Sequence, residues 1–141
     1  MLDKRTYVDT LVKNFWKLGY MTVKRKFGTY LPEPEKVGVF DIDIVARQKK
    51  DYAIGITLAA EDINNSNLLE KLSYLATRHT KFSNRKVQLF VGVASHQLKK
   101  VKQLIENLDD EVKKNIKLIS ITETNIPSIR RKKKTGKNLF A

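Results

Sequence analysis

Apolar side chains recur at helical spacing in three stretches of the chain. The first stretch runs from about Asp3 to Leu18 and ends before a glycine, the residue that most often follows a helix. The second follows the polar segment from Glu61 to Ser66 and continues to about His79. The third begins at the capping residue Ser95 and extends to about Leu108. The spacing therefore predicts three amphipathic helices.

Five other stretches have the alternating or continuously apolar patterns typical of strands. Alternation in the second of them would place Asp41 and Asp43 on one face, and in the third it separates Ile54 and Ile56 from Gly55 and Thr57. A loop with two prolines follows the first strand, and a polar turn from Arg47 to Lys50 follows the second. The predicted strands are Tyr20 to Lys26, Val37 to Ala46, Tyr52 to Leu58, Val87 to Ala94 and Ile116 to Ile121.

The order of these elements predicts the fold class. Three consecutive strands favour an antiparallel meander, and the later strand–helix–strand unit favours a parallel crossover. The expected fold is α/β (α+β) in the order α-β-β-β-α-β-α-β, with helices against a mixed central sheet. We expect one domain over residues 1–125 and a basic tail over residues 126–141.

Composition narrows the class of protein. The chain has 141 residues, 41% of them hydrophobic, which is enough for a buried core. It contains no cysteine, and no apolar run approaches the roughly 18 residues of a membrane span. The start of the chain shows no secretory signal pattern. These features favour a cytoplasmic protein without a membrane partner.

The net charge is the strongest indication of a partner. Lys and Arg number 28 against 15 Asp and Glu, a net charge of +13, and phosphate backbones are the commonest cytoplasmic polyanion. The alternative is a charge that only keeps the protein in solution. The expected partner is therefore a nucleic acid, and DNA in particular, bound by clusters of basic residues. They are Lys24, Arg25, Lys26, Arg47, Lys49 and Lys50, with Arg130, Arg131, Lys132, Lys133 and Lys134 of the tail.

Asp41 and Asp43 form an acidic pair within an apolar stretch. On one strand face their spacing would be about 7 Å, and two such carboxylates suit a hard cation such as Mg²⁺ or Mn²⁺. The alternative is a carboxylate pair bridged to nearby Lys or Arg side chains. Trp16 is expected to be a packing residue and not a platform for base stacking.

The order helix, three strands, helix, strand resembles the core of the PD-(D/E)XK, or restriction-endonuclease-like, nuclease superfamily. Compact members include archaeal Holliday-junction resolvases, and the resemblance covers about Thr6 to Ile121. The motif that carries it is Phe-Asp-Ile-Asp-Ile-Val-Ala at 40–46. The resemblance implies that Asp43 is the metal-binding aspartate, with Asp41 beside it and Asp9 as the carboxylate from the first helix.

The chain departs from the family at the next strand. The resemblance predicts Glu-x-Lys there, but the matching positions hold Gly55 and Thr57, which supply neither a carboxylate nor a cation. Lys71 is a candidate for a relocated catalytic lysine, although its position beside Glu70 favours a solvated side chain. Glu61 or Asp62 would replace the missing glutamate only if the chain bends back.

These observations predict a DNA-binding protein with a nuclease-like fold and an incomplete, inactive centre. One alternative is an active, metal-dependent endonuclease with Asp43 and Lys71 as catalytic residues. A second is a protein-interaction subunit, and a homodimer or a partner protein is compatible with each.

Overall fold

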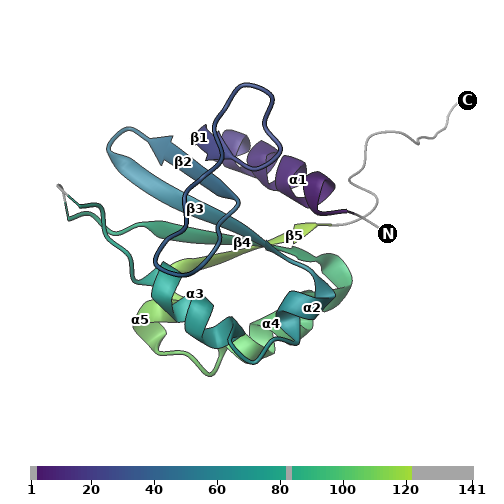
Figure 1. Ribbon diagram of the computed structural model, residues 1–141. Helices are drawn as coiled ribbons and strands as arrows, with labels where there is room; N and C mark the ends of the chain where they lie inside the picture. The colour runs from purple at the N-terminus through teal and green to yellow at the C-terminus, as the bar shows by residue number, and fades with distance from the viewer. Residues whose placement is uncertain (1–2, 82–83, 122–141) are drawn as a thin grey trace, which may run out of the picture.

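The computed structural model describes residues 3–81 and 84–121, so the predicted tail at 126–141 lies outside the described residues. Figure 1 shows the helices and strands, coloured along the chain. The elements are α1 (Lys4–Lys17), β1 (Met21–Arg25), β2 (Ile44–Gln48), β3 (Asp51–Leu58), α2 (Ala60–Ile63), α3 (Leu68–Ala76), β4 (Gln88–Ala94), the 3₁₀ turn η1 (Ser95–Gln97), α4 (Leu98–Ile105), α5 (Asp110–Lys113) and β5 (Ile116–Ile121).

The strands form one five-stranded sheet in the order β1-β2-β3-β4-β5. β1 and β3 each pair antiparallel with β2, whereas β3, β4 and β5 run parallel. Each parallel step crosses over through helices, as short antiparallel connections cannot join parallel strands. The predicted mixed sheet with helices against it is therefore confirmed.

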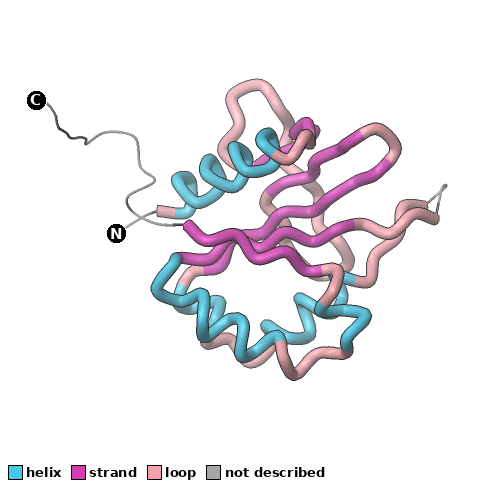
Figure 2. Tube along the Cα trace, turned by 180° about the vertical axis from the view of Figure 1, so that it is seen from behind, coloured by secondary structure: helices cyan, strands magenta, loops and turns pink. Residues whose placement is uncertain are grey.

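The helices form two layers, one on each face of the sheet. Figure 2 shows α1 on one side, with the remaining helices on the other. Beneath α1, Leu11 and Phe15 pack with Ala53 and Phe90. Against the other face, Ile54 and its neighbours on β3 pack with α3 and α4. The predicted alternation of β3 is thus confirmed, because its alternate side chains enter two separate apolar clusters.

The predicted strand Val37 to Ala46 is wrong over most of its length. β2 begins only at Ile44, and Val37 forms an isolated bridge with Phe40 in a tight turn. Gly38 has a φ of +63°, and a Cβ at this position would lie 2.6 Å from the hydroxyl oxygen of Tyr74. This left-handed residue and its close approach to α3 interrupt the extended chain. Asp41 and Asp43 consequently precede β2 instead of lying within it.

Smaller differences concern the ends of elements. Arg47 and Gln48 belong to β2, so the β2–β3 turn consists of Lys49 and Lys50, with Lys49 at a φ of 57°. The expected third helix divides into η1 and α4, and α5 follows it. No helix of the described ranges is long and apolar enough to cross a membrane.

Candidate functional site

A pocket of about 560 Å³ lies where the parallel strands β3, β4 and β5 end. Leu58, Ala94 and Ile121 line it, and each is the last or near-last residue of its strand. The carboxyl ends of parallel strands are the usual place for a ligand in such sheets, because the connections that leave them diverge. The start of α1, the end of β1, the Asp41–Asp43 segment and α3 complete the wall.

Asp43 is the central acidic residue of this pocket and is buried, with 3% of its surface exposed. Its Oδ2 accepts hydrogen bonds from the backbone N–H of Thr57 at 2.8 Å and from the Thr57 hydroxyl at 3.0 Å. The ammonium of Lys4 donates to the same Oδ2 at 3.2 Å and to the Thr57 hydroxyl oxygen at 3.0 Å. A buried carboxylate needs such partners to offset its lost hydration.

A second ammonium group approaches the other carboxylate oxygen. Lys26 Nζ lies 3.6 Å from Asp43 Oδ1, and its side chain is mostly buried. Asp43 therefore faces two cations from two elements, one on each oxygen. Sequence reasoning offered ion pairing as the alternative to metal binding, and this is the arrangement that the structure shows.

Lys4 was not singled out from the sequence. It lies 39 residues before Asp43, in the first turn of α1, where a lysine reads as an ordinary solvated side chain. No local pattern signals this pair, because the contact depends on how α1 is placed over the ends of β2 and β3.

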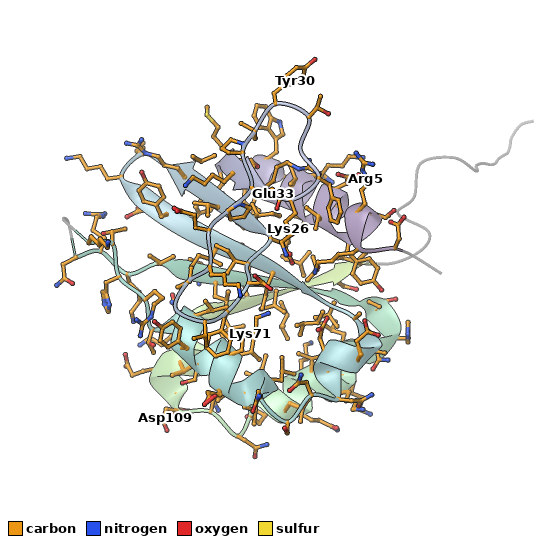
Figure 3. All side chains as sticks on the ribbon, in the orientation of Figure 1. Arg5, Lys26, Tyr30, Glu33, Lys71 and Asp109 are labelled. Carbon is orange, nitrogen blue, oxygen red and sulfur yellow. The ribbon has the colours of Figure 1, made fainter. Side chains whose placement is uncertain are left out.

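Lys71 enters the pocket from α3 and is half-buried. Burial lowers the pKa of its ammonium group, whereas the carboxylates of Asp43, Asp62 and Asp41 act to raise it. Lys71 lines the same pocket as Lys26 and is therefore not the fully solvated residue that its position beside Glu70 favoured; Figure 3 shows Lys71 at α3. Among the described residues it has neither an ion pair nor a hydrogen bond from its side chain.

The chain does bend back after β3. Glu61 and Asp62, in α2, line the same pocket as Asp43 and Lys71. The Asp62 carboxylate is engaged locally, since its Oδ2 accepts a hydrogen bond from the backbone N–H of Ala59 at 2.8 Å. Glu61 and Asp41 are exposed at the rim.

Two expected site residues lie elsewhere. The carboxylate of Asp9 accepts a hydrogen bond from the guanidinium of Arg25, and Asp9 does not line the pocket. Gly55 lies beneath α1, where a Cβ would come within 2.8 Å of Phe15 and 3.1 Å of Leu11. Of the residues that the resemblance implies for the centre, the structure brings Asp41, Asp43 and Thr57 into one pocket, whereas Asp9 and Gly55 do not line it. The β3 side chain against Asp43 is Thr57, not the residue two positions earlier.

The side chains present do not fit a divalent cation held by carboxylates. No three His, Asp or Glu side chains in residues 3–81 and 84–121 are grouped closely enough to hold a metal ion. Asp41 and Asp43 share the pocket, but both oxygens of Asp43 face ammonium groups. Mg²⁺ or Mn²⁺ would have to displace Lys4 or Lys26 to reach them.

The first predicted basic cluster is largely neutralised. Lys24 lies 3.7 Å from Glu35, Arg25 pairs with Asp9, and Lys26 pairs with Asp43. Each of these cations therefore has an acidic partner within the protein, and their contact with nucleic acid stays a prediction. Sequence proximity suggested one patch, whereas the side chains reach three different carboxylates.

The second basic cluster remains accessible. Arg47, Lys49 and Lys50 are exposed at the end of the β2–β3 hairpin, or border it, and carry no ion pair among the described residues. Arg47 also lies over the ring of Tyr52, with 5.6 Å between the guanidinium carbon and the ring centroid. Arg130, Arg131, Lys132, Lys133 and Lys134 lie outside the described residues.

Comparison of the chain with protein-family models, curated proteins and solved structures gives no match. Its function is therefore argued from the site alone.

Proposed function

We propose that this chain is a DNA-binding protein with a restriction-endonuclease-like fold whose catalytic centre is replaced by a salt bridge. The observation that carries the proposal is the ammonium of Lys4 on Asp43 Oδ2, 3.2 Å away. Lys4 occupies the side of the carboxylate at which a cation would bind, and it supplies a fixed positive charge of its own. The sheet and the first helix support the resemblance, because the second and third strands bring Thr57 against Asp43.

Net charge supports binding to a polyanion. The chain carries +13, and the accessible cations of the β2–β3 hairpin stand clear of the neutralised β1 cluster. Lysine and arginine side chains without ion-pair partners can contact phosphates without first breaking an ion pair. Binding of this kind is electrostatic and largely independent of sequence.

The binding test is a titration of duplex DNA at several salt concentrations. Each phosphate contact contributes about −0.9 to the slope of log affinity against log salt. Replacing Arg47, Lys49 and Lys50 with alanine should flatten the slope by roughly 2 to 3. The matched control removes the same charge from α4, at Lys99, Lys100 and Lys102, which Figure 1 shows away from the hairpin. Affinity that is independent of salt would contradict the proposal.

The catalytic test is a cleavage assay with Mg²⁺ and with Mn²⁺ on duplex, single-stranded and four-way-junction DNA. Phosphodiester hydrolysis by this route needs a metal in fixed geometry and a positioned water, so we expect no cleavage. The Asp43→Asn variant is the control for contaminating nucleases. Cleavage that Asp43→Asn abolishes would instead support the alternative of an active endonuclease, which the place of Lys71 beside Asp43 favours.

Exposed apolar side chains favour a partner protein as a second candidate function. Trp16 is 72% exposed, so its predicted role as a packing residue is wrong, and Tyr30, at the loop tip in Figure 3, is 96% exposed. Large apolar side chains in contact with water are typical of interaction surfaces when they lie together. Sedimentation of the wild type and of Trp16→Ala at increasing concentration tests self-association at this residue.

A further inference from the structure

The pocket at the carboxyl ends of β3, β4 and β5 has the size of a small-ligand site. Its volume of about 560 Å³ lies within the roughly 300–1,000 Å³ usual for such sites. Side chains from α1, α2 and α3 enclose it together with Lys26, which follows β1, and the turn after β4. A duplex cannot enter a space of this size, but a single nucleotide unit can.

Some charged side chains of the pocket are bonded within the protein, and others are not. The carboxylate of Asp43 is paired with Lys4, and that of Asp62 with the backbone of Ala59. Asp3 likewise accepts a hydrogen bond from the backbone N–H of Thr6 at 2.9 Å. These internal bonds leave Lys71 as the half-buried cation without a hydrogen-bonded partner among the described residues.

Polar groups of three kinds therefore face an incoming ligand. The ammonium of Lys71 offers three N–H donors, for which phosphate oxygens are strong acceptors. The exposed carboxylates of Asp41 and Glu61 would repel a bare phosphate, but they accept hydrogen bonds from sugar hydroxyls and base amino groups. Ser95, His96 and Gln97, in the turn after β4, add neutral polar groups.

We infer that this pocket binds one nucleoside monophosphate unit, with its phosphate on Lys71 and its hydroxyl or amino donors on Asp41 and Glu61. The unit is either a free nucleotide or the phosphorylated end of a strand. For the strand end, the inference rests on the proposed DNA binding. It adds to that proposal a ligand class, the nucleoside monophosphates, and a binding residue, Lys71. The lowered pKa of Lys71 agrees, because burial removes hydration from its ammonium group and a phosphate would supply hydrogen bonds in place of that water.

The first measurement is calorimetric titration of the full chain at low salt with nucleoside monophosphates, and with the nucleosides as the phosphate-free comparison. We expect the monophosphates to bind and the nucleosides to bind at least about tenfold more weakly. Lys71→Gln should weaken monophosphate binding by about tenfold or more, and Lys71→Arg should retain most of it. The matched control is Lys13→Gln, an exposed lysine of α1 outside the pocket, which should bind as the wild type does.

The second measurement distinguishes the two sources of the nucleotide. Linear single strands with a 5′-phosphate, a 3′-phosphate or neither are compared with a circular strand of the same length. If the protein prefers a phosphorylated end and loses this preference in Lys71→Gln, the ligand is the strand end. If all strands bind equally and monophosphates still bind, the ligand is the free nucleotide.

Failure of the inference and failure of the proposed function give different results. If DNA binds but no monophosphate does, or if Lys71→Gln binds monophosphates as the wild type does, the inference is overturned and DNA binding stands. If monophosphates bind with the expected dependence on Lys71 but no DNA binds, the pocket is confirmed and the proposed function is wrong. Thermal unfolding of each variant shows whether a loss of binding reflects a loss of folding.

Discussion

The ammonium group of Lys4 and the carboxylate of Asp43 are 3.2 Å apart, although 39 residues separate them in the chain. The contact joins the first turn of α1 to the segment that enters β2, and Thr57 of β3 bonds to both side chains. One polar cluster therefore connects the helix to two strands. Since Asp43 is buried, the cluster is held in a region of reduced hydration, in which each missing partner has a cost.

Lys4→Met tests the strength of this connection. The methionine keeps the length of the side chain but leaves Lys26 as the one cation in an ion pair with Asp43 among the described residues. We expect a loss of about 1–2 kcal/mol in the free energy of unfolding, measured by urea denaturation. A double-mutant cycle with Asp43→Asn separates the pair from other effects. Additive losses would mean that Lys4 and Asp43 are not coupled.

Gly55→Ala tests where this β3 position lies. A Cβ would approach a ring carbon of Phe15 to 2.8 Å and the Cβ of Ile44 to 3.1 Å, beneath α1. Overpacking of this kind should lower stability by about 1–3 kcal/mol, seen as a lower melting temperature. An open position facing the pocket, as expected from the resemblance, would instead accept alanine without loss.

Arg25→Ala tests whether the β1 cations serve the fold or bind DNA. Arg25 is largely buried and pairs with Asp9. A double-mutant cycle of Arg25→Ala and Asp9→Ala should therefore give a coupling energy on the order of 1 kcal/mol in the free energy of unfolding. The salt dependence of DNA affinity should stay unchanged, in contrast to the hairpin variant. If the slope of log affinity against log salt flattens by about 1 in Arg25→Ala, Arg25 contacts a DNA phosphate.

Lys71→Met makes a prediction about pH. Because the pKa of Lys71 is lowered in the folded protein, the unfolded chain holds this proton more tightly between the lowered pKa and the ordinary value of 10.5. The wild type therefore carries a penalty at neutral pH that disappears as the pH rises through this interval. Lys71→Met should be the more stable protein at neutral pH, with a gain that shrinks toward pH 10.5.

Urea denaturation at a series of pH values measures this difference. The surrounding Asp41, Asp43, Asp62 and Glu61 are common to both proteins, as are Lys4 and Lys26, so their own titration largely cancels in the comparison. A difference between the variants that stays constant from neutral to alkaline pH would contradict the lowered pKa.

The sequence by itself determined the order of the elements and the mixed sheet. Ile54, Ile56 and Leu58 of β3 alternate with Ala53, Gly55 and Thr57, and the structure places these two sets on opposite faces. Such patterns are reliable because buried and exposed positions alternate with a fixed period along one helix or strand. This period can be read from residues that are close together in the sequence.

Only the tertiary structure decided which charges meet. Lys24, Arg25 and Lys26 read as one basic patch, yet each reaches a different carboxylate, and Lys71 turns into the pocket instead of toward solvent. The predicted second strand does not extend through Gly38, which lies against Tyr74, 36 residues later in the chain. These outcomes depend on how distant segments pack together. The charge and the periodicity of one segment carry no information about which residues of another segment will contact it.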